Sequence, residues 1–407
     1  MARKTRLIAL DVSQVSFLDD CHARVFHGVM RYAATKPAWE MIFNVPPLYP
    51  LGTFDSIERL QEMGVDGLIA CSLSGKVEAM VRAIRLPAVR IGRLSGPQLF
   101  PLVTWDNAEV GRMAARHFLD RGFASLAFCG PSDTLFSVAR LNAFEETALA
   151  AGRQCQSFLR RHNRFAFELP SASARVRGRT GGGVAAAMPE LAAWIADLPK
   201  PVGIMGANDF LARELLDVCR SLRLNVPAEV AIIGVDNSRV LCDTCSPSIS
   251  SVDLNAERIG FEAARLLDRL ISGKRPPKRP LIVPPLGVAT RMSSDILAVQ
   301  NPTVAKAVAF IRDRFAQRIS LADIARHCGV SPTVLKTRFR ACLGRTIHSE
   351  IQRQRLAQAR DLLARTELAV GQIAEACGFS VSHLTHLFTG TAGMAPAAWR
   401  LKHKMVR

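Results

Sequence analysis

The chain has 407 residues and a formal net charge of +18, with an isoelectric point near 10.2. This length predicts two or three domains, each able to bury a sizeable core. Residues 302–407 hold 17 Lys and Arg against 6 Asp and Glu, so about a quarter of the chain carries a net charge of +11. A domain this basic attracts a polyanion, and its helical spacing favours nucleic acid over a membrane.

The N-terminus places basic residues before an apolar run that Asp11 interrupts. This pattern predicts a first strand and no signal peptide, and no window is long enough to span a membrane. Ten Cys residues are scattered singly apart from Cys242 and Cys245, which have no second pair or His beside them. We therefore expect a cytoplasmic chain with free thiols, no metal site and no cofactor.

Between residues 6 and 290, apolar runs alternate with amphipathic helices, which is typical of an α/β fold with buried parallel strands. The region is too long for one sheet, and one strand–helix series ends near Thr104–Asn107 where another opens with a long helix. The expected strands are 7–11, 40–45, 67–70, 88–91, 126–129, 202–205 and 230–235, and the expected helices are 19–35, 77–84, 108–121, 141–151, 210–222 and 256–271.

Polar residues follow several of these strands, and they belong to a series of motifs that extends along this part of the chain. The segment 103–130, the motif from Arg140 to Phe144, and the pairs Asn208-Asp209 and Asp236-Asn237 stand in one order along the chain. In this order they resemble the LacI-type, periplasmic-binding-protein-like sensor domain over about 285 residues. The resemblance implies two lobes joined by crossing strands, with a ligand between them at the carboxyl ends of the strands.

A neutral polyol in such a cleft needs carboxylate and amide acceptors and an Arg donor, because unpaired buried polar groups are costly. Arg140, Asn208, Asp209 and Asp236 are these residue types at the expected strand ends, and we expect them to contact the ligand. Each has a structural alternative. Asp236 could cap a turn, Asn208 could cap the helix that follows, and Arg140 could pair across a lobe face.

Two further segments lack a regular pattern. Residues 170–183 are rich in Gly and Arg but have no phosphate-loop spacing, so a surface loop is expected there. Residues 292–302 are expected to link the domains. We therefore divide the chain into a ligand-sensing domain at 1–291, a linker at 292–302 and a DNA-binding domain at 303–407.

The basic region contains one pattern written twice. In the first copy a short amphipathic helix ends at Gly329 and Ser331 can cap a second helix. In the second copy Gly378 and Ser380 stand at the same positions. The second helices are expected at 332–342 and 381–390, separated by a long helix at 347–363. One copy could be an ordinary helical hairpin, but two copies 49 residues apart indicate paired helix-turn-helix motifs.

This stretch resembles the DNA-binding domain of the AraC family over about 100 residues. The most specific part runs from Phe379 to Arg400 and includes Gly393, Met394, Pro396 and Trp399. His386 and Thr389 depart from the family, which usually has Arg and Lys at these positions. The departures put strong DNA binding by the second recognition helix in doubt.

In a helix-turn-helix the second helix enters the major groove and brings donors to base edges. The expected groove-facing residues are Thr333, Lys336, Thr337 and Arg340 on the first recognition helix, and Ser382, His383 and His386 on the second. Lys and Arg can reach guanine or phosphate, and Thr can contact a thymine methyl. The short side chains of the second helix suggest positioning more than base reading, and a solvated helix face is the alternative for every position.

Together, the two resemblances imply a DNA-binding transcription regulator controlled by a small sugar, with a pentose such as xylose as effector and a homodimer as the assembly. RNA polymerase would be a further partner if the protein activates transcription. The same architecture with a non-pentose effector is the main alternative, because this sensor fold has no fixed ligand. A sugar-binding transport component is less consistent with the basic domain. An enzyme is also disfavoured, because the sequence has no nucleophile–base, phosphate-loop or metal motif.

Overall fold

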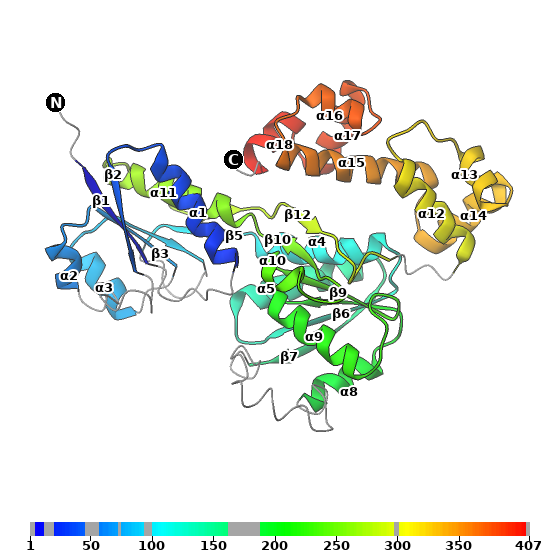
Figure 1. Cartoon of the computed structure of the whole chain (residues 1–407), viewed down its shortest axis with the longest axis horizontal. Helices are drawn as coiled ribbons and strands as arrows, with labels where there is room; N and C mark the ends of the chain where they lie inside the picture. Colours follow the sequence, from blue (N-terminus) through cyan, green and yellow to red (C-terminus); the bar gives the residue numbers. More distant parts are fainter. Residues whose placement is uncertain are drawn as a thin grey trace.

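The computed structural model describes residues 5–11, 20–44, 57–71, 75–92, 100–161, 188–296 and 301–403. Within these residues the chain forms two six-stranded sheets flanked by helices, followed by a helical domain (Figure 1). The predicted fold class, a two-lobed α/β sensor domain ahead of an all-α double helix-turn-helix domain, is confirmed. The predicted loop at 170–183 and residues 297–300 of the predicted linker lie outside the described residues.

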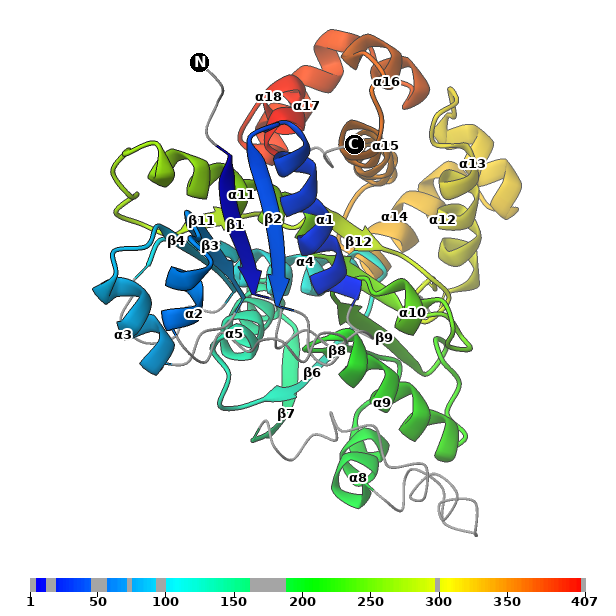
Figure 2. The same cartoon turned by 60° about the vertical axis from the view of Figure 1, so that its left-hand side comes forward.

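The first lobe is built on an all-parallel sheet with the order β11-β5-β4-β3-β1-β2. Its central strands are continuous apolar runs because helices cover them, as expected of a parallel sheet. α11 packs against α1 and against β3, β4 and β5, and these elements can be followed in Figure 2. The elements are β1 (Arg6–Asp11), α1 (Asp20–Ala34), β2 (Trp39–Asn44), α2 (Ile57–Glu62), β3 (Gly67–Ala70), α3 (Gly75–Ala83), β4 (Ala88–Ile91), β5 (Leu102–Trp105), α11 (Ala256–Ile271) and β11 (Leu281–Val283).

The second lobe has the strand order β12-β10-β9-β8-β6-β7, in which only the pairing of β10 with β12 is antiparallel. The elements are α4 (Asn107–Asp120), β6 (Ser125–Pro131), α5 (Leu135–Ala150), β7 (Gln154–Arg160), α8 (Pro189–Asp197), β8 (Val202–Gly206), α9 (Asp209–Ser221), β9 (Val230–Val235), α10 (Arg239–Cys242), β10 (Ser250–Asp253) and β12 (Gly287–Ala289).

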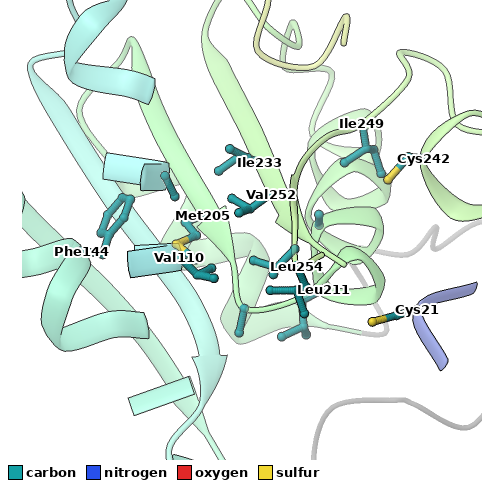
Figure 3. Close-up of a cluster of buried hydrophobic side chains, with 14 of the residues drawn as sticks. Cys21, Val110, Phe144, Met205, Leu211, Ile233, Cys242, Ile249, Val252 and Leu254 are labelled. Atoms are coloured by element: carbon teal, nitrogen blue, oxygen red, sulfur yellow. The ribbon is translucent and has the colours of Figure 1, made fainter. Parts of the chain in front are cut away.

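The chain passes between the lobes three times: from β5 to α4, from β10 to α11, and from β11 to β12. The first crossing is at the predicted switch near Thr104–Asn107. Val110 of α4 and Phe144 of α5 pack with strand residues such as Met205 in the core of the second lobe (Figure 3). Because its apolar side is buried in this core, α4 is a rigid part of the lobe.

The C-terminal domain comprises α12 (Pro302–Arg314), α13 (Leu321–Cys328), α14 (Pro332–Leu343), α15 (Ile347–Arg365), α16 (Val370–Ala376), α17 (Val381–Ala392) and α18 (Pro396–His403). The predicted caps are confirmed: Ser331 accepts from the amide of Val334 at 3.4 Å, and Ser380 accepts from that of His383 at 3.3 Å. Gly378 adopts φ +73°, and a Cβ there would lie 2.5 Å from the carbonyl oxygen of Ala316. Glycine is therefore required at this turn on two grounds.

The predicted elements are all present where the structure describes them, with differences at their ends. α5 begins at Leu135, six residues before the predicted start. The short strand β12, the edge strand β7 and the helix α8 were not predicted. β7 has only exposed and half-buried side chains, several of them polar, so its sequence carries little of the apolar signal of the inner strands.

Candidate functional site: the sensor cluster and the DNA-binding helices

Arg140 lies on α5, where its side chain is 4% exposed. Its Nε donates to Oδ1 of Asn107 at 2.9 Å, and Nη1 donates to the carbonyl oxygen of Ala207. α4 and α5 cross closely at Gly111, where a Cβ would lie 2.1 Å from the carbonyl oxygen of Arg140. The close crossing brings the guanidinium to the first residue of α4 and to the end of β8.

Asn208 and Asp209 follow β8, and both have structural partners. Asn208 caps α9, with Oδ1 accepting from the amide of Leu211 at 2.9 Å. Asp209 is fully buried and accepts from the amide of Ser238 at 2.8 Å and the hydroxyl of Ser251 at 2.6 Å. Burial raises the pKa of Asp209 to about 7, although these hydrogen bonds oppose the shift. The geometry favours the structural alternative for Asn208 and a structural role for Asp209.

Asp236 directly follows β9 and has a φ of +108°, a conformation that few residues other than glycine adopt. Its side chain is partly exposed, and its carbonyl oxygen accepts from Nη2 of Arg24. The next residue, Asn237, donates from Nδ2 to Asp253 at 2.9 Å and accepts from Arg291 at 2.9 Å. This strained strand end therefore carries a carboxylate held at the edge of a polar network.

The structure adds two residues that the sequence did not single out. Arg24 on α1 of the first lobe forms an ion pair with Asp253 of the second lobe at 3.1 Å. Asp253 ends β10, so the rule that found Asp236, a polar residue directly after a buried strand, would also have found Asp253. Arg24 has no comparable local signal, because its partners in the second lobe are more than 200 residues away in the sequence. We call Arg140, Asn208, Asp209 and Asp236, together with Arg24 and Asp253, the sensor cluster.

All four candidate DNA contacts on α14 are exposed: Thr333, Lys336, Thr337 and Arg340. The opposite side of the helix buries Leu335 and Phe339 against α12 and α13. Among the described residues, Lys336 and Arg340 have no ion-pair partner, so both charges point into solvent. This face can present two cations to a phosphate backbone or to guanine acceptors.

The candidates on α17 are also exposed, but they carry less charge: Ser382, His383 and His386. The His383 ring packs edge-on against Phe379, with ring centroids 5.3 Å apart, which restricts its reach. Leu384 and Phe388 are fully buried on the other side. The two recognition helices thus have the same fold and different chemistry.

Arg355 on α15 fixes the two motifs relative to each other. Its guanidinium donates to the carbonyl oxygens of Phe315 at 2.6 Å and Gln317 at 2.9 Å, next to the first motif. It also donates to the carbonyl oxygen of Gly378 at 2.7 Å, in the turn of the second motif. One side chain therefore satisfies carbonyl groups from both halves of the domain.

The comparisons with known proteins agree with this architecture. Residues 115–294 match the model of a periplasmic binding protein-like domain, residues 52–163 match that of periplasmic binding proteins and the sugar-binding domain of the LacI family, and residues 324–402 match a helix-turn-helix domain. The Xylose operon regulatory protein of Haemophilus influenzae is 26% identical over 387 residues, covering 93% of this chain and 94% of the relative. That of Escherichia coli K12 is 28% identical over 358 residues, covering 84% and 86%.

The chain is homologous to these transcription regulators. A solved structure described as the xylose-binding transcription activator xylR has a TM-score of 0.56 at 26% identity and covers 99% of this chain and 100% of its own. A complex of the transcriptional regulator CelR with cellobiose has a TM-score of 0.53 at 26% identity and covers 72% and 85%. The chain therefore joins a LacI-like sensor domain to an AraC-type DNA-binding domain, as predicted, and its homologues are regulators, not enzymes.

No helix among the described residues is long and apolar enough to cross a membrane. The same residues contain no group of three or more His, Cys, Asp and Glu that could hold a metal ion. All ten Cys residues are free thiols, including Cys242 and Cys245. Burial raises the pKa of the Cys242 thiol far above its usual value, which disfavours the thiolate form.

Proposed function

We propose that this protein is a cytoplasmic, homodimeric regulator that senses a pentose, with xylose as the first candidate, and binds an operator with its C-terminal helices. The observation that carries the proposal is the end-to-end similarity to proteins named as xylose operon regulators and to a structure named as xylose-binding. The alignments cover both the sensor domain and the output domain, which supports a sensor that acts on DNA binding.

At the sensor cluster, Arg140 and Asp236 are proposed to contact the sugar directly. Arg140 can donate to a hydroxyl from a position that Asn107 and Ala207 already fix. Asp236 offers a carboxylate acceptor from a backbone conformation that is costly to maintain, as is common at ligand sites. Asn208 and Asp209 support this edge by capping α9 and tying β8 to β10.

At the DNA, the first recognition helix is proposed to read bases through Thr333, Lys336, Thr337 and Arg340. Ser382, His383 and His386 on the second helix would mainly position the protein on the backbone. α15 and Arg355 hold the two helices apart at a fixed angle, which suits entry into successive grooves on one face of the duplex. If the regulator activates transcription, RNA polymerase is its further partner.

Titration calorimetry of the full chain with the four aldopentoses tests the ligand half of this proposal. We expect xylose to bind most tightly. No binding by any aldopentose would overturn the pentose assignment and leave the regulator assignment intact.

A second effector class has support from one comparison. The CelR structure, at the same 26% identity as the xylose-binding neighbour, contains cellobiose, although it covers only 72% of this chain. A β-glucoside disaccharide is therefore the alternative effector. Including cellobiose in the same titration separates the two, because only the true effector will give saturable heat that Asp236→Asn abolishes.

A further inference from the structure

Arg24 joins the first lobe to the strand end that carries Asp236. It lies on α1, which is fixed in the first lobe by a close crossing with α11. At this crossing a Cβ on Gly260 would lie 1.9 Å from the carbonyl oxygen of Val25, the residue next to Arg24. Val25 is buried, whereas the side chain of Arg24 reaches the second lobe. Arg24 therefore moves with the first lobe, and Asp236 moves with the second.

The two terminal nitrogens of Arg24 have different acceptors in the second lobe. Nη1 contacts both carboxylate oxygens of Asp253, at 3.2 and 3.1 Å, and Nη2 donates to the carbonyl oxygen of Asp236. The carboxylate of Asp253 is itself held in place, because it accepts from Nδ2 of Asn237 and from the amide of Asn255, each at 2.9 Å. Asp253 thus anchors the planar guanidinium, which presents its second nitrogen to Asp236.

A second contact from the same face of α1 supports the first. Asp20, one turn before Arg24, accepts from the amide of Arg239 in the second lobe at 3.2 Å, and its carboxylate lies 3.9 Å from Nε of Arg24 (Figure 2). Burial alone would lower the pKa of Arg24, but the charge of Asp253, followed by those of Cys21 and Asp20, outweighs burial and raises the pKa above its usual value. The first turns of α1 therefore contact the segment 236–239 at two points.

The carbonyl group that Arg24 holds belongs to an unusual turn. Asp236 has a φ of +108° and Asn237 a φ of +51°. The amide of Asp236 donates to the carbonyl oxygen of Val252 at 3.1 Å, and the amide of Asn237 donates to the hydroxyl of Ser251 at 2.9 Å. The second lobe thus holds the amides of this turn, and the first lobe holds the carbonyl of Asp236. Strained backbone persists only where such contacts fix it, so losing one of them frees the peptide unit to rotate.

We propose that Arg24 is a positioning residue of the sugar site, which fixes the carboxylate of Asp236 from the opposite lobe. The proposal rests on the proposed function, in which Asp236 contacts the sugar. Because the geometry of Asp236 depends on both lobes, sugar affinity depends on how the lobes lie relative to each other. The sugar in turn favours the arrangement in which Arg24 reaches Asp236.

Hydrogen exchange of the full chain without sugar, followed by mass spectrometry, tests the positioning itself. Arg24→Gln should speed exchange in the segment 236–240 by about fivefold or more, because the turn loses its contact with the first lobe. Exchange in the central strand β8 should stay as in the wild type. Arg24→Lys keeps a charge opposite Asp253 and should recover part of the protection. Thermal melts check that each variant is folded.

Arg31→Gln is the matched control. Arg31 lies on the same helix and pairs with Glu257 at 2.5 Å, and its side chain is 25% exposed against 24% for Arg24. Both partners of this pair belong to the first lobe, so the variant should leave exchange in the segment 236–240 unchanged. Unchanged exchange in Arg24→Gln, or an equal increase in Arg31→Gln, would overturn the proposal.

Calorimetric titration with D-xylose tests the consequence for the sugar. Arg24→Gln should raise the Kd at least about tenfold, as expected for the loss of a charge-assisted contact, whereas Arg31→Gln should not change it. In the Asp236→Asn background the same Arg24→Gln change should raise the Kd by less than about twofold, because Arg24 acts through Asp236. Fully additive losses would contradict the proposal. If the wild type binds no pentose, the effector assignment fails, and hydrogen exchange alone decides whether Arg24 positions Asp236.

Discussion

Arg353 on α15 donates to the carboxylate of Asp120, the last residue of α4, at 2.9 Å. The same helix α4 begins with Asn107, which accepts from Arg140 at 2.9 Å. One rigid helix of 14 residues therefore contacts the proposed sugar site at one end and the DNA-binding domain at the other. A change at Arg140 can reach α15 through α4 without any rearrangement within the lobe core.

Replacing Asp120 with Ala should weaken the coupling between sugar and DNA. The change removes the acceptor for Arg353 and leaves the sensor cluster untouched. We expect the sugar Kd to stay within about twofold of the wild type, while the sugar-induced change in operator affinity falls by about 1 kcal/mol or more. Mobility-shift titrations with and without sugar measure this change.

Asp313→Ala is the matched control, because Asp313 is exposed at the end of α12 and its Arg312 contact is 4.0 Å long. It should leave the coupling unchanged. A full sugar response in Asp120→Ala would rule out α4 as the route.

The buried ion pairs of Glu350 should make the stability of the C-terminal domain depend on pH. Its carboxylate is fully buried and accepts from Arg345 at 2.6 Å and from Arg353 at 2.7 Å. Burial alone would raise the pKa of Glu350, but the hydrogen bonds and charges of its arginine partners outweigh it and hold the pKa below the usual 4.5. Because the folded pKa is depressed, the stabilisation is complete above about pH 4.5 and is lost as the pH falls through the lower folded value.

Glu350→Gln should therefore lower the free energy of unfolding by about 3 kcal/mol at pH 7, since it leaves two arginines without their shared buried carboxylate. The difference between variant and wild type should shrink below pH 4.5. Thermal melts of both proteins from pH 7 to pH 3.5 check this. A difference that is constant across the range would show that the carboxylate charge contributes nothing.

The double helix-turn-helix was predictable because its signals are local. Gly329 and Gly378 end the first helices, and Ser331 and Ser380 cap the second ones, each within four residues of the element it defines. The interface between the domains was not predictable in this way. Asp120 and Arg353 are 233 residues apart in the sequence, and nothing near either residue indicates the other.

Asp236 and Asp209 should respond differently to the same substitution. Asp236→Asn changes a partly exposed carboxylate at the proposed sugar site, so we expect at least about a tenfold loss of sugar affinity with little change in Tm. Asp209→Asn changes a fully buried acceptor of the Ser238 amide and the Ser251 hydroxyl. It should cost about 1–3 kcal/mol of stability. Calorimetric titration and thermal melts on both variants separate the loss of sugar affinity from the loss of stability. A stability loss in Asp236→Asn and an affinity loss in Asp209→Asn would mean that Asp209 contacts the sugar and Asp236 is structural.

Asp209 and Asp236 were both predicted from their position after a strand, and that criterion could not tell which of them contacts the ligand. Both are acidic residues that follow a buried strand of one sheet, so both met the same criterion. Only the folded chain shows that Ser251, 42 residues further along, occupies one oxygen of Asp209. In the same way, the sequence was compatible with either helix capping or ligand binding by Asn208. The hydrogen bond that Asn208 accepts from the amide of Leu211 shows that it caps the helix.

The two recognition helices should contribute unequally to operator binding. Lys336→Ala and Arg340→Ala remove exposed cations from α14, so each should weaken binding by about 1–3 kcal/mol and reduce the salt dependence by about one counterion. His386→Ala on α17 should have a smaller effect, because it removes no Lys or Arg side chain from the exposed face. Mobility shifts at several salt concentrations measure both quantities. Equal losses from α14 and α17 would contradict the asymmetry.

The central claim is that sugar bound at the sensor cluster controls operator binding. It is tested most directly by the operator Kd of the full chain, measured by mobility shift with and without saturating D-xylose, in the wild type and in Asp236→Asn. We predict that xylose changes the wild-type Kd by about 5-fold or more, within the usual range of allosteric coupling, and leaves that of Asp236→Asn unchanged. Equal operator affinity with and without xylose in the wild type, or an undiminished response in the variant, would contradict it.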